Sequence, residues 1–523
     1  MKLSDQDFAD IQGLLRFGHG HLRAARFFLL RISDPVAARA WLADATPQKW
    51  EDKSKSAVKI TNAIKGPLPD TALQVAFTYE GLKAIGLDET IAADFPLDFR
   101  SGMAGEEARS RRLGDVGEND PKGWEWGGSP DKLPHVLVLV YATEDRLASF
   151  TTEVKGTRWD NAFVEIKCLT TTDMKDHEPF GFLDGVSQPE IDWDPAKPAR
   201  LRSTLKYTNV SALGEFLLGY PNEYARYTDR PLVDPEQDPA RILPLAEDKP
   251  GKRDFGRNGT YLVLRDVYQD VAGFWQYLDK AAQGNARQRR WLAHLIVGRM
   301  LSGDPIVPLS ADPIAGVGPD LEDVWQNQFT FKQDPDGTTC PLGAHIRRAN
   351  PRNADYPAGT NWFLKPLRAL GLSRKHPHYD LVASTRFHRI LRRGREYGTL
   401  LTPDDAVKQN ANRDDRGLRF IGLNANITRQ FEFLQTSWIN YPKFDGLDDG
   451  DPLVGNRKPL LNGAPTDGFS IPQQSGLPQR LEGLPQFVKV RGGAYFFLPG
   501  ISALRYLAPR DQGASASSWP PAP

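Results

Sequence analysis

Four stretches of the chain repeat one pattern of hydrophobic and polar positions: a β-branched or aromatic run, a polar break, and then an amphipathic segment. Continuous runs of this kind are typical of buried strands, and apolar residues at helical spacing are typical of helices that cover a sheet. The predicted strand–helix pairs are 25–32 with 35–45, 135–142 with 144–154, 260–265 with 269–282, and 418–423 with 427–438.

Two of these strand–helix pairs lie in each half of the chain, which indicates an α+β protein built from two related modules. Ferredoxin-like βαββαβ units produce this spacing, because each helix covers one face of an antiparallel sheet. A solenoid is disfavoured because the pairs recur without a fixed period. We therefore predict two ferredoxin-like domains, each with its own antiparallel sheet flanked by helices.

A chain of 523 residues is too long for one ordinary core, and polar segments indicate where it divides. Residues 192–257 are rich in Pro, Asp and Arg, and the Ala-, Ser- and Pro-rich end is typical of disorder. The role of that tail stays open. The predicted divisions are an N-terminal domain at 1–200, a connecting segment at 201–256, a C-terminal domain at 257–508 with an insertion near 353–386, and a disordered tail at 509–523.

Composition excludes several classes of protein. Lys plus Arg and Asp plus Glu number 66 each, so no net charge attracts nucleic acid or an anionic membrane. The longest apolar run, Val136–Tyr141, is about a third of the ~20 residues of a membrane span. Cys168 and Cys340 cannot form a disulfide framework. With no secretory signal at the start, we expect a cytoplasmic protein and leave export by another route open.

The first candidate for chemistry is Asp184, which lies in the segment Gly181-Phe182-Leu183-Asp184-Gly185. One reading is a plain turn, in which the aspartate hydrogen-bonds its own backbone. The functional reading is that the glycines let the backbone pack closely over a ligand while Asp184 faces it. By itself this short pattern does not choose between the two.

The second candidate is His345, in the segment that runs from Cys340 to Arg352. Most histidines are surface or core residues, but small apolar residues precede this one and arginines follow it. Arg347, Arg348 and Arg352 could pair with the carboxylates of a ligand. A third segment, Arg392-Arg393-Gly394-Arg395-Glu396-Tyr397-Gly398, reads either as a solvated basic patch or as part of the same site.

Taken together and in this order, the three segments resemble the dye-decolorizing peroxidase family. Arg392, followed five residues later by Tyr397-Gly398, fits the register of the family's distal arginine, with Arg393 as the alternative one residue along. Segments 10–16, 429–435 and 490–499 are similar to other parts of the family, so the resemblance spans roughly residues 8–508. The 47 positions between His345 and Arg392 match the family's longer subgroup.

The resemblance implies one haem b per chain, held mainly by the C-terminal domain, with His345 as the axial ligand of the iron. It places Gly185, Arg352, Leu418 and Phe420 at the cofactor. Asp184 would move the proton and Arg392 would stabilise charge as hydrogen peroxide is reduced through a ferryl intermediate. Dyes, phenols or other aromatic donors would then be oxidised by one-electron steps, with an acidic optimum because aspartate has a pKa of ~3.9.

Several points remain open at this stage. Tyr397 and Trp438 are either electron relays or packing residues, and either Glu432 or Asp451 supports the proximal histidine. The physiological reductant is unnamed, and the protein is a monomer or a homo-oligomer. One competing hypothesis is a haem-handling protein that binds haem or releases its iron. Another is a structural module of paired ferredoxin-like domains without haem.

Overall fold

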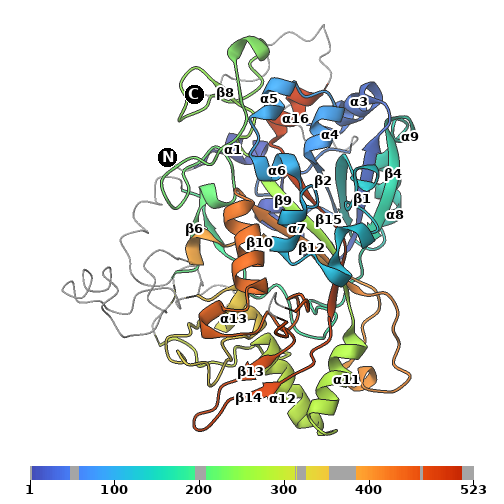
Figure 1. Cartoon of the computed structure of the whole chain (residues 1–523). Helices are drawn as coiled ribbons and strands as arrows, with labels where there is room; N and C mark the ends of the chain where they lie inside the picture. Colours follow the sequence, from blue (N-terminus) through green and yellow to red (C-terminus); the bar gives the residue numbers. More distant parts are fainter. Residues whose placement is uncertain are drawn as a thin grey trace, which may run out of the picture.

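A nine-stranded antiparallel sheet lies at the centre of the computed structural model, which describes residues 3–47, 58–194, 208–311, 314, 325–352, 385–459 and 463–508 (Figure 1). Its strands lie in the order β10-β12-β9-β15-β2-β3-β1-β4, and β11 also pairs with β12. The strands are β1 (Ala24–Ile32), β2 (Thr71–Phe77), β3 (Val136–Ala142), β4 (Phe163–Thr170), β9 (Thr260–Gln269), β10 (Leu391–Arg392), β11 (Arg395–Tyr397), β12 (Gly417–Asn424) and β15 (Val488–Leu498).

The two halves of this sheet have the same internal order. Within β1–β4, and again within β9, β10, β12 and β15, the strands lie side by side as second, third, first and fourth along the chain. This repeated order, with helices in the crossovers, confirms the prediction of two ferredoxin-like units in an α+β fold.

The expectation that the two units keep separate sheets is wrong. They meet where Phe497 of β15 pairs with Phe77 of β2, so one sheet runs through both. Each of these strands is the outer strand of its own unit. Pairing them satisfies backbone groups that an open sheet edge would leave unpaired.

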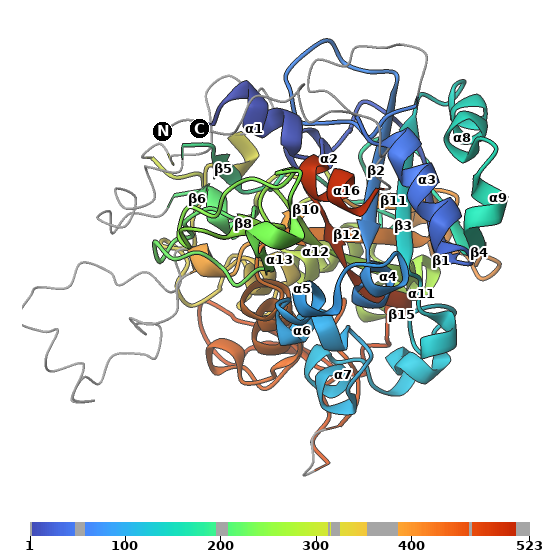
Figure 2. The ribbon, with the colours of Figure 1, turned by 90° about the horizontal axis from the view of Figure 1, so that it is seen from above.

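Both faces of β1, β2 and β3 are largely buried, which explains their apolar sequences. Successive side chains of a strand point to opposite faces, so Phe28 and Leu30 enter one core, and Phe27 and Leu29 enter the other. Both views place α3 (Pro35–Ala45), α8 (Leu147–Lys155) and α9 (Trp159–Ala162) beside β1 and β4 (Figures 1 and 2).

A third core lies below the C-terminal half of the sheet, where α11 (Val271–Ala281), α12 (Ala286–Val297) and α13 (His345–Ala349) gather (Figure 1). Phe180 and Phe182, from the segment that carries Asp184, pack into this core. The remaining helices and strands are α1 (Asp5–Asp10), α2 (Leu14–Phe17), α4 (Tyr79–Ala84), α5 (Glu89–Ala93), α6 (Leu97–Ser101), α7 (Glu107–Leu113), α15 (Pro403–Ala406), α16 (Ile501–Leu507), β5 (Glu190–Asp192), β6 (Val210–Ala212), β7 (Leu232–Val233), β8 (Arg253–Asp254), β13 (Phe469–Ile471) and β14 (Gln479–Leu481).

The four predicted strands are present as β1, β3, β9 and β12. The helix predicted over 427–438 is instead two π-helical segments, η9 (Thr428–Glu432) and η10 (Leu434–Asn440). Cys168 and Cys340 are free thiols. Within the described ranges, no helix is long and apolar enough to cross a membrane. The predicted tail, and the predicted insertion apart from its last two residues, lie outside the described residues, and the domain boundaries stay a prediction.

Candidate active site

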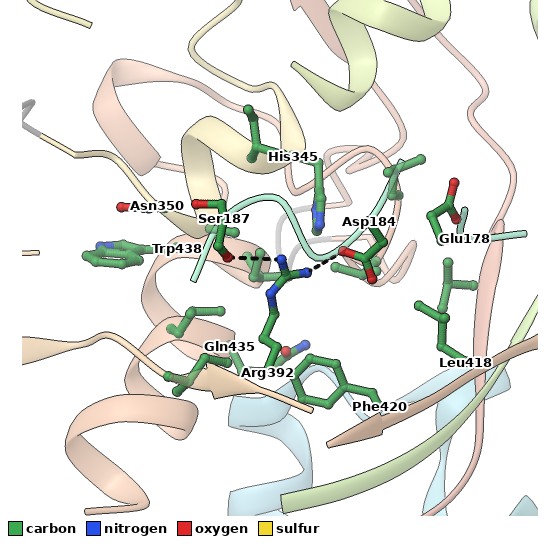
Figure 3. Close-up of a pocket in the computed structure, with 18 of the residues that line it drawn as sticks. Glu178, Asp184, Ser187, His345, Asn350, Arg392, Leu418, Phe420, Gln435 and Trp438 are labelled. Atoms are coloured by element: carbon green, nitrogen blue, oxygen red, sulfur yellow. Dashed lines mark hydrogen bonds and ion pairs between the residues drawn. The ribbon is translucent and has the colours of Figure 1, made fainter. Parts of the chain in front are cut away.

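A cavity of about 340 Å³ brings most of the predicted site residues together (Figure 3). It lies against the C-terminal half of the sheet, with walls from β9, β12, α13, η10 and the segment that carries Asp184. Apolar side chains, among them Val267, Val488 and Leu453, form much of the lining. The predicted residues that line it are Asp184, His345, Arg352, Arg392, Leu418, Phe420 and Trp438.

His345 is the first residue of α13, and its imidazole is oriented by a buried carboxylate. Nδ1 of His345 lies 2.9 Å from Oδ2 of Asp451, whose other oxygen accepts the backbone N–H groups of Leu453 and Val454. Because Asp451 can only accept, Nδ1 carries the proton and Nε2 is left with a lone pair. Nε2 has no hydrogen-bond partner among the described residues, and the ring points into the cavity (Figure 3).

The same carboxylate also affects the protonation of the histidine. Burial alone would lower the pKa of the His345 imidazole, but the Asp451 carboxylate raises it above its ordinary value. Glu432, the other carboxylate considered from the sequence, lies elsewhere. It forms an ion pair with Arg109 and accepts a hydrogen bond from Tyr495. Asp451 is therefore the carboxylate that contacts His345.

Asp184 is held in a tight turn by its own backbone. Its N–H donates to the carbonyl of Asp176 at 2.8 Å, and the N–H of Gly185 donates to Oδ1 of Asp184 at 2.7 Å. Gly181 and Gly185 have φ angles of 98° and 78°, in the left-handed region that favours glycine. The turn thus presents Asp184 to the cavity, while Gly185 is not among the described residues that line it.

Arg392 is the last residue of β10, and its side chain binds the turn that carries Asp184. Its Nη1 lies 3.0 Å from Oδ1 of Asp184, and its Nη2 donates to the carbonyl of Ser187 at 3.2 Å. Its backbone N–H donates to Oε1 of Gln188 at 3.0 Å. Arg393, the alternative one residue along, donates to the backbone carbonyls near Leu14 instead and does not line the cavity.

The ion pair controls the ionisation of Asp184. Burial alone would raise the pKa of the Asp184 carboxyl, but Arg392, the Gly185 N–H and His345 together hold that pKa below its ordinary range. Oδ2 of Asp184 has no hydrogen-bond partner in the part of the chain that the structure describes. An ionised carboxylate with one free oxygen can accept a proton from a molecule in the cavity.

Buried positive charge forms another wall of the cavity. Arg299 and Arg352 both donate to Oδ1 of Asn327. Burial, together with the neighbouring Arg352 and Arg392, lowers the pKa of Arg299 to about 9. Within the described ranges no carboxylate forms an ion pair with Arg299. This wall would therefore be stabilised by an anionic ligand group.

The other two arginines predicted to face a ligand do not line the cavity. The guanidinium of Arg347 binds Asp334 and the carbonyl of Cys340, and that of Arg348 binds carbonyls of the segment that follows η10. Both side chains are buried, and both hold loops around α13. The prediction for these two was wrong because sequence spacing does not show which way a side chain leaves a short helix.

The two candidate relay residues have different positions. Trp438 lies in η10 and lines the cavity, with its ring edge-on to His388 and Phe433. Tyr397 is buried behind the cavity wall, with the guanidinium of Arg419 3.4 Å above its ring and its hydroxyl donating to the carbonyl of Val267.

Glu178 and His388 are among the further polar residues of the cavity wall that the sequence did not indicate. Glu178 lies six positions before Asp184, so a search of the same segment for a second carboxylate could have found it. His388 stacks on Phe433 with ring centroids 3.6 Å apart, and burial lowers the pKa of its imidazole to about 4. Nothing in its sequence context indicates this position.

Comparison with known proteins gives one consistent result, although no family model matches the chain. The chain is 27% identical over 521 residues to the dye-decolorizing peroxidase msp1 of Mycetinis scorodonius, covering 95% of this chain and 87% of that protein. It is 26% identical over 530 residues to the multifunctional dye peroxidase DyP2 of an Amycolatopsis species, with 94% and 92% covered.

Solved structures agree with these relatives. An ancestral D-type dye-decolorizing peroxidase superposes with a TM-score of 0.68 at 25% identity and covers 97% of this chain and 99% of its own. The matches extend over nearly the whole length of both partners, which leaves no large part of either chain unexplained. Together with the paired ferredoxin-like units and the cavity that joins Asp184, His345 and Arg392, they confirm the resemblance to the dye-decolorizing peroxidases and support an enzyme of this kind.

Proposed function

We propose that this enzyme is a haem b peroxidase that reduces hydrogen peroxide and oxidises dyes, phenols or other aromatic donors in one-electron steps. The observation that carries the proposal is the free Nε2 of His345, which faces the Asp184–Arg392 ion pair in one cavity (Figure 3). A neutral imidazole nitrogen is an ordinary axial ligand for haem iron, and the ion pair supplies a base and a cation for peroxide.

The residues of the cavity fit haem b. His345 would hold the iron through Nε2, and the apolar walls suit a macrocycle. Arg299 and Arg352 would pair with its propionate carboxylates, which would neutralise the buried positive wall. When bound, haem supplies the redox-active iron at which peroxide is reduced. The fit supports one haem per chain, held mainly by the C-terminal half.

Asp184 moves the proton in this proposal. Its free oxygen Oδ2 would accept a proton from one oxygen of hydrogen peroxide and give it to the other, which would depart as water with the two electrons of this reduction supplied by the bound haem. Arg392 stabilises the negative charge that develops on the departing oxygen. Asp451 keeps the proton of His345 on Nδ1 and thereby keeps Nε2 a ligand.

Leu418 and Phe420 would limit what reaches the reacting oxygens. Both are apolar residues of β12 that line the cavity, Phe420 beside Arg392 and Leu418 on the side of Glu178 (Figure 3). A bulky dye would then give up its electrons at the protein surface, and Trp438 would carry them inward from a position in the cavity wall. Tyr397 is a second proposed relay, and because it is buried a dye could not touch it. Undiminished radical trapping on a Trp438→Phe variant would exclude that residue.

The pH dependence of dye oxidation follows from Asp184. Because its pKa is held below the ordinary range, the ionised base form persists into acid and is lost only as the pH falls through that lowered value. We expect the rate with a dye, measured with haem fully loaded, to reach its maximum below neutrality. A rate that first reaches its maximum above neutrality would contradict the assignment of Asp184 as the base.

Replacing Asp451 tests the support of His345. Asp451→Asn removes the carboxylate that orients the imidazole, and loss of such a partner of a metal-binding histidine costs about 10- to 100-fold in affinity or activity. We expect a loss of this size in haem affinity or peroxide turnover, measured by haem titration and initial rates. Glu432→Gln is the matched control, because Glu432 binds Arg109 and Tyr495 and not His345. Equal effects of the two variants would contradict the pairing.

The proposed function is tested by titrating the purified protein with haem and then assaying dye oxidation with and without hydrogen peroxide. We expect saturation at one haem per chain and dye oxidation that requires peroxide. Haem binding without peroxide-dependent turnover would favour the haem-handling alternative.

A further inference from the structure

Glu178 is a second carboxylate in the wall of the cavity, on the same turn as Asp184 (Figure 3). Its Oε1 accepts the backbone N–H of Phe182, and its Oε2 accepts that of Phe180, both at 3.0 Å. Its own N–H donates to the carbonyl of Phe182 at 2.9 Å. The side chain therefore closes the loop whose next residues place Asp184, so it holds the position of that aspartate.

Glu178 is hydrogen-bonded to the side-chain amide of Gln269, which can donate to the ionised carboxylate or accept from the protonated carboxyl group. Nε2 of Gln269, in β9, donates to Oε2 of Glu178 at 2.8 Å. The other amide atom, Oε1 of Gln269, is buried and has no hydrogen-bond partner within the described ranges. If the Gln269 amide rotates by 180°, its Oε1 faces Glu178 and can accept a hydrogen bond from the protonated carboxyl group.

The charges around Glu178 favour its neutral form. Burial raises the pKa of the Glu178 carboxyl to about 7 against the hydrogen bonds from Phe180, Phe182 and Gln269, and Asp184, which faces it from the same loop, adds to the rise. His345 of α13 is the cationic group that acts on it when protonated, and Arg392 of β10 is bound to Asp184. The residues that β9 and β12 contribute beside it, Gln269 and Leu418, are uncharged.

We propose that Glu178 is a positioning residue for Asp184 that must hold a proton while peroxide is reduced, and that its ionisation sets the upper pH limit of that step. This inference rests on the proposed function. An ionised Glu178 would add a second negative charge to a cavity in which Arg392 already forms an ion pair with Asp184. Arg392 stabilises the negative charge that develops on the departing oxygen. A negative charge on Glu178 would repel that developing charge and so slow the step.

The test is the pH profile of kcat/KM for hydrogen peroxide, measured on the haem-loaded full-length chain. In the wild type we expect the rate to fall about tenfold per pH unit above a pH near the Glu178 pKa of about 7. Glu178→Gln, which cannot ionise, should lose this alkaline fall. Gln269→Leu removes a donor that stabilises the ionised carboxylate, so the fall should move to higher pH.

Glu396, in β11, provides a matched control. Burial raises the pKa of its carboxyl to about 7 as well, but its side chain does not line the cavity. Glu396→Gln should leave the alkaline fall in place. An unchanged fall in Glu178→Gln, or its loss in Glu396→Gln, would overturn the inference.

A second readout does not depend on turnover. The infrared absorption of protonated carboxylic acids should lose one component as the pH rises through about 7 that is present in the wild type and in Glu396→Gln but missing in Glu178→Gln. A band that is the same in both proteins would also overturn the inference. If the haem-loaded wild type does not react with peroxide at any pH, the proposed function falls as well. If the wild type reacts with peroxide and Glu178→Gln keeps the same fall in rate at alkaline pH, the inference about Glu178 fails while the proposed function stands.

Discussion

Asp184→Asn retains haem but reacts with hydrogen peroxide about 10²- to 10⁴-fold more slowly, the range that a positioned general base contributes. The asparagine can still accept the Gly185 N–H and the Arg392 guanidinium through Oδ1, so the turn and the cavity keep their shape. It cannot accept a proton at the position of Oδ2. The loss should therefore appear in the second-order rate constant for peroxide, measured by stopped-flow absorption, and not in haem content.

Asp176→Asn is the matched control for this variant. Asp176 lies on the same loop, but its carboxylate is exposed and paired with Arg23 outside the cavity. We expect its rate constant to remain within about threefold of the wild type, because exposed ion pairs contribute little. A rate constant for Asp184→Asn that stays equally close to the wild type would remove Asp184 from the mechanism.

Arg392→Leu slows the reaction with peroxide about 10²- to 10³-fold, the usual cost of removing one donor that stabilises developing negative charge. The variant has a second consequence, because Arg392 is the largest influence that lowers the pKa of Asp184. Without it, burial dominates and that pKa rises. The base form of Asp184 is then lost at a higher pH than in the wild type, so the acid limb of the rate profile moves toward neutrality.

Arg393→Leu separates this effect from general loss of charge. Arg393 is adjacent in sequence but binds the backbone carbonyls of Leu14 and Leu15, so we expect lower thermal stability with a nearly normal peroxide rate per bound haem. If Arg393→Leu reproduces both the slow rate and the shifted acid limb, the assignment of Arg392 is off by one position.

The sequence predicted the strands whose apolar runs are longest, but it missed β2, which is also buried on both faces. β1 and β3 are continuous apolar runs and were recognised, whereas β15 was not, because Arg491, Gly492 and Gly493 interrupt its pattern. The structure explains one of these glycines. A Cβ on Gly492 would lie 2.3 Å from Nε1 of Trp126, so close packing of a distant tryptophan requires glycine there.

The candidate site was predictable as three segments but not as a set of contacts. His345, Asp184 and Arg392 came from local motifs and the family resemblance, and the structure brings them to one cavity. The partner of His345 lies 106 positions away in Asp451, and no local pattern indicates such a contact. Edge pairing between β2 and β15 was missed for the same reason, because it depends on how two complete units meet.

The most direct test of the central claim is the absorption spectrum of the haem-loaded wild type before and after one equivalent of hydrogen peroxide, beside His345→Ala. We predict a Soret band that peroxide changes and a reducing dye restores, and a band that is lost or altered in the variant. A Soret band that peroxide leaves unchanged, or no Soret band at all, would contradict the account.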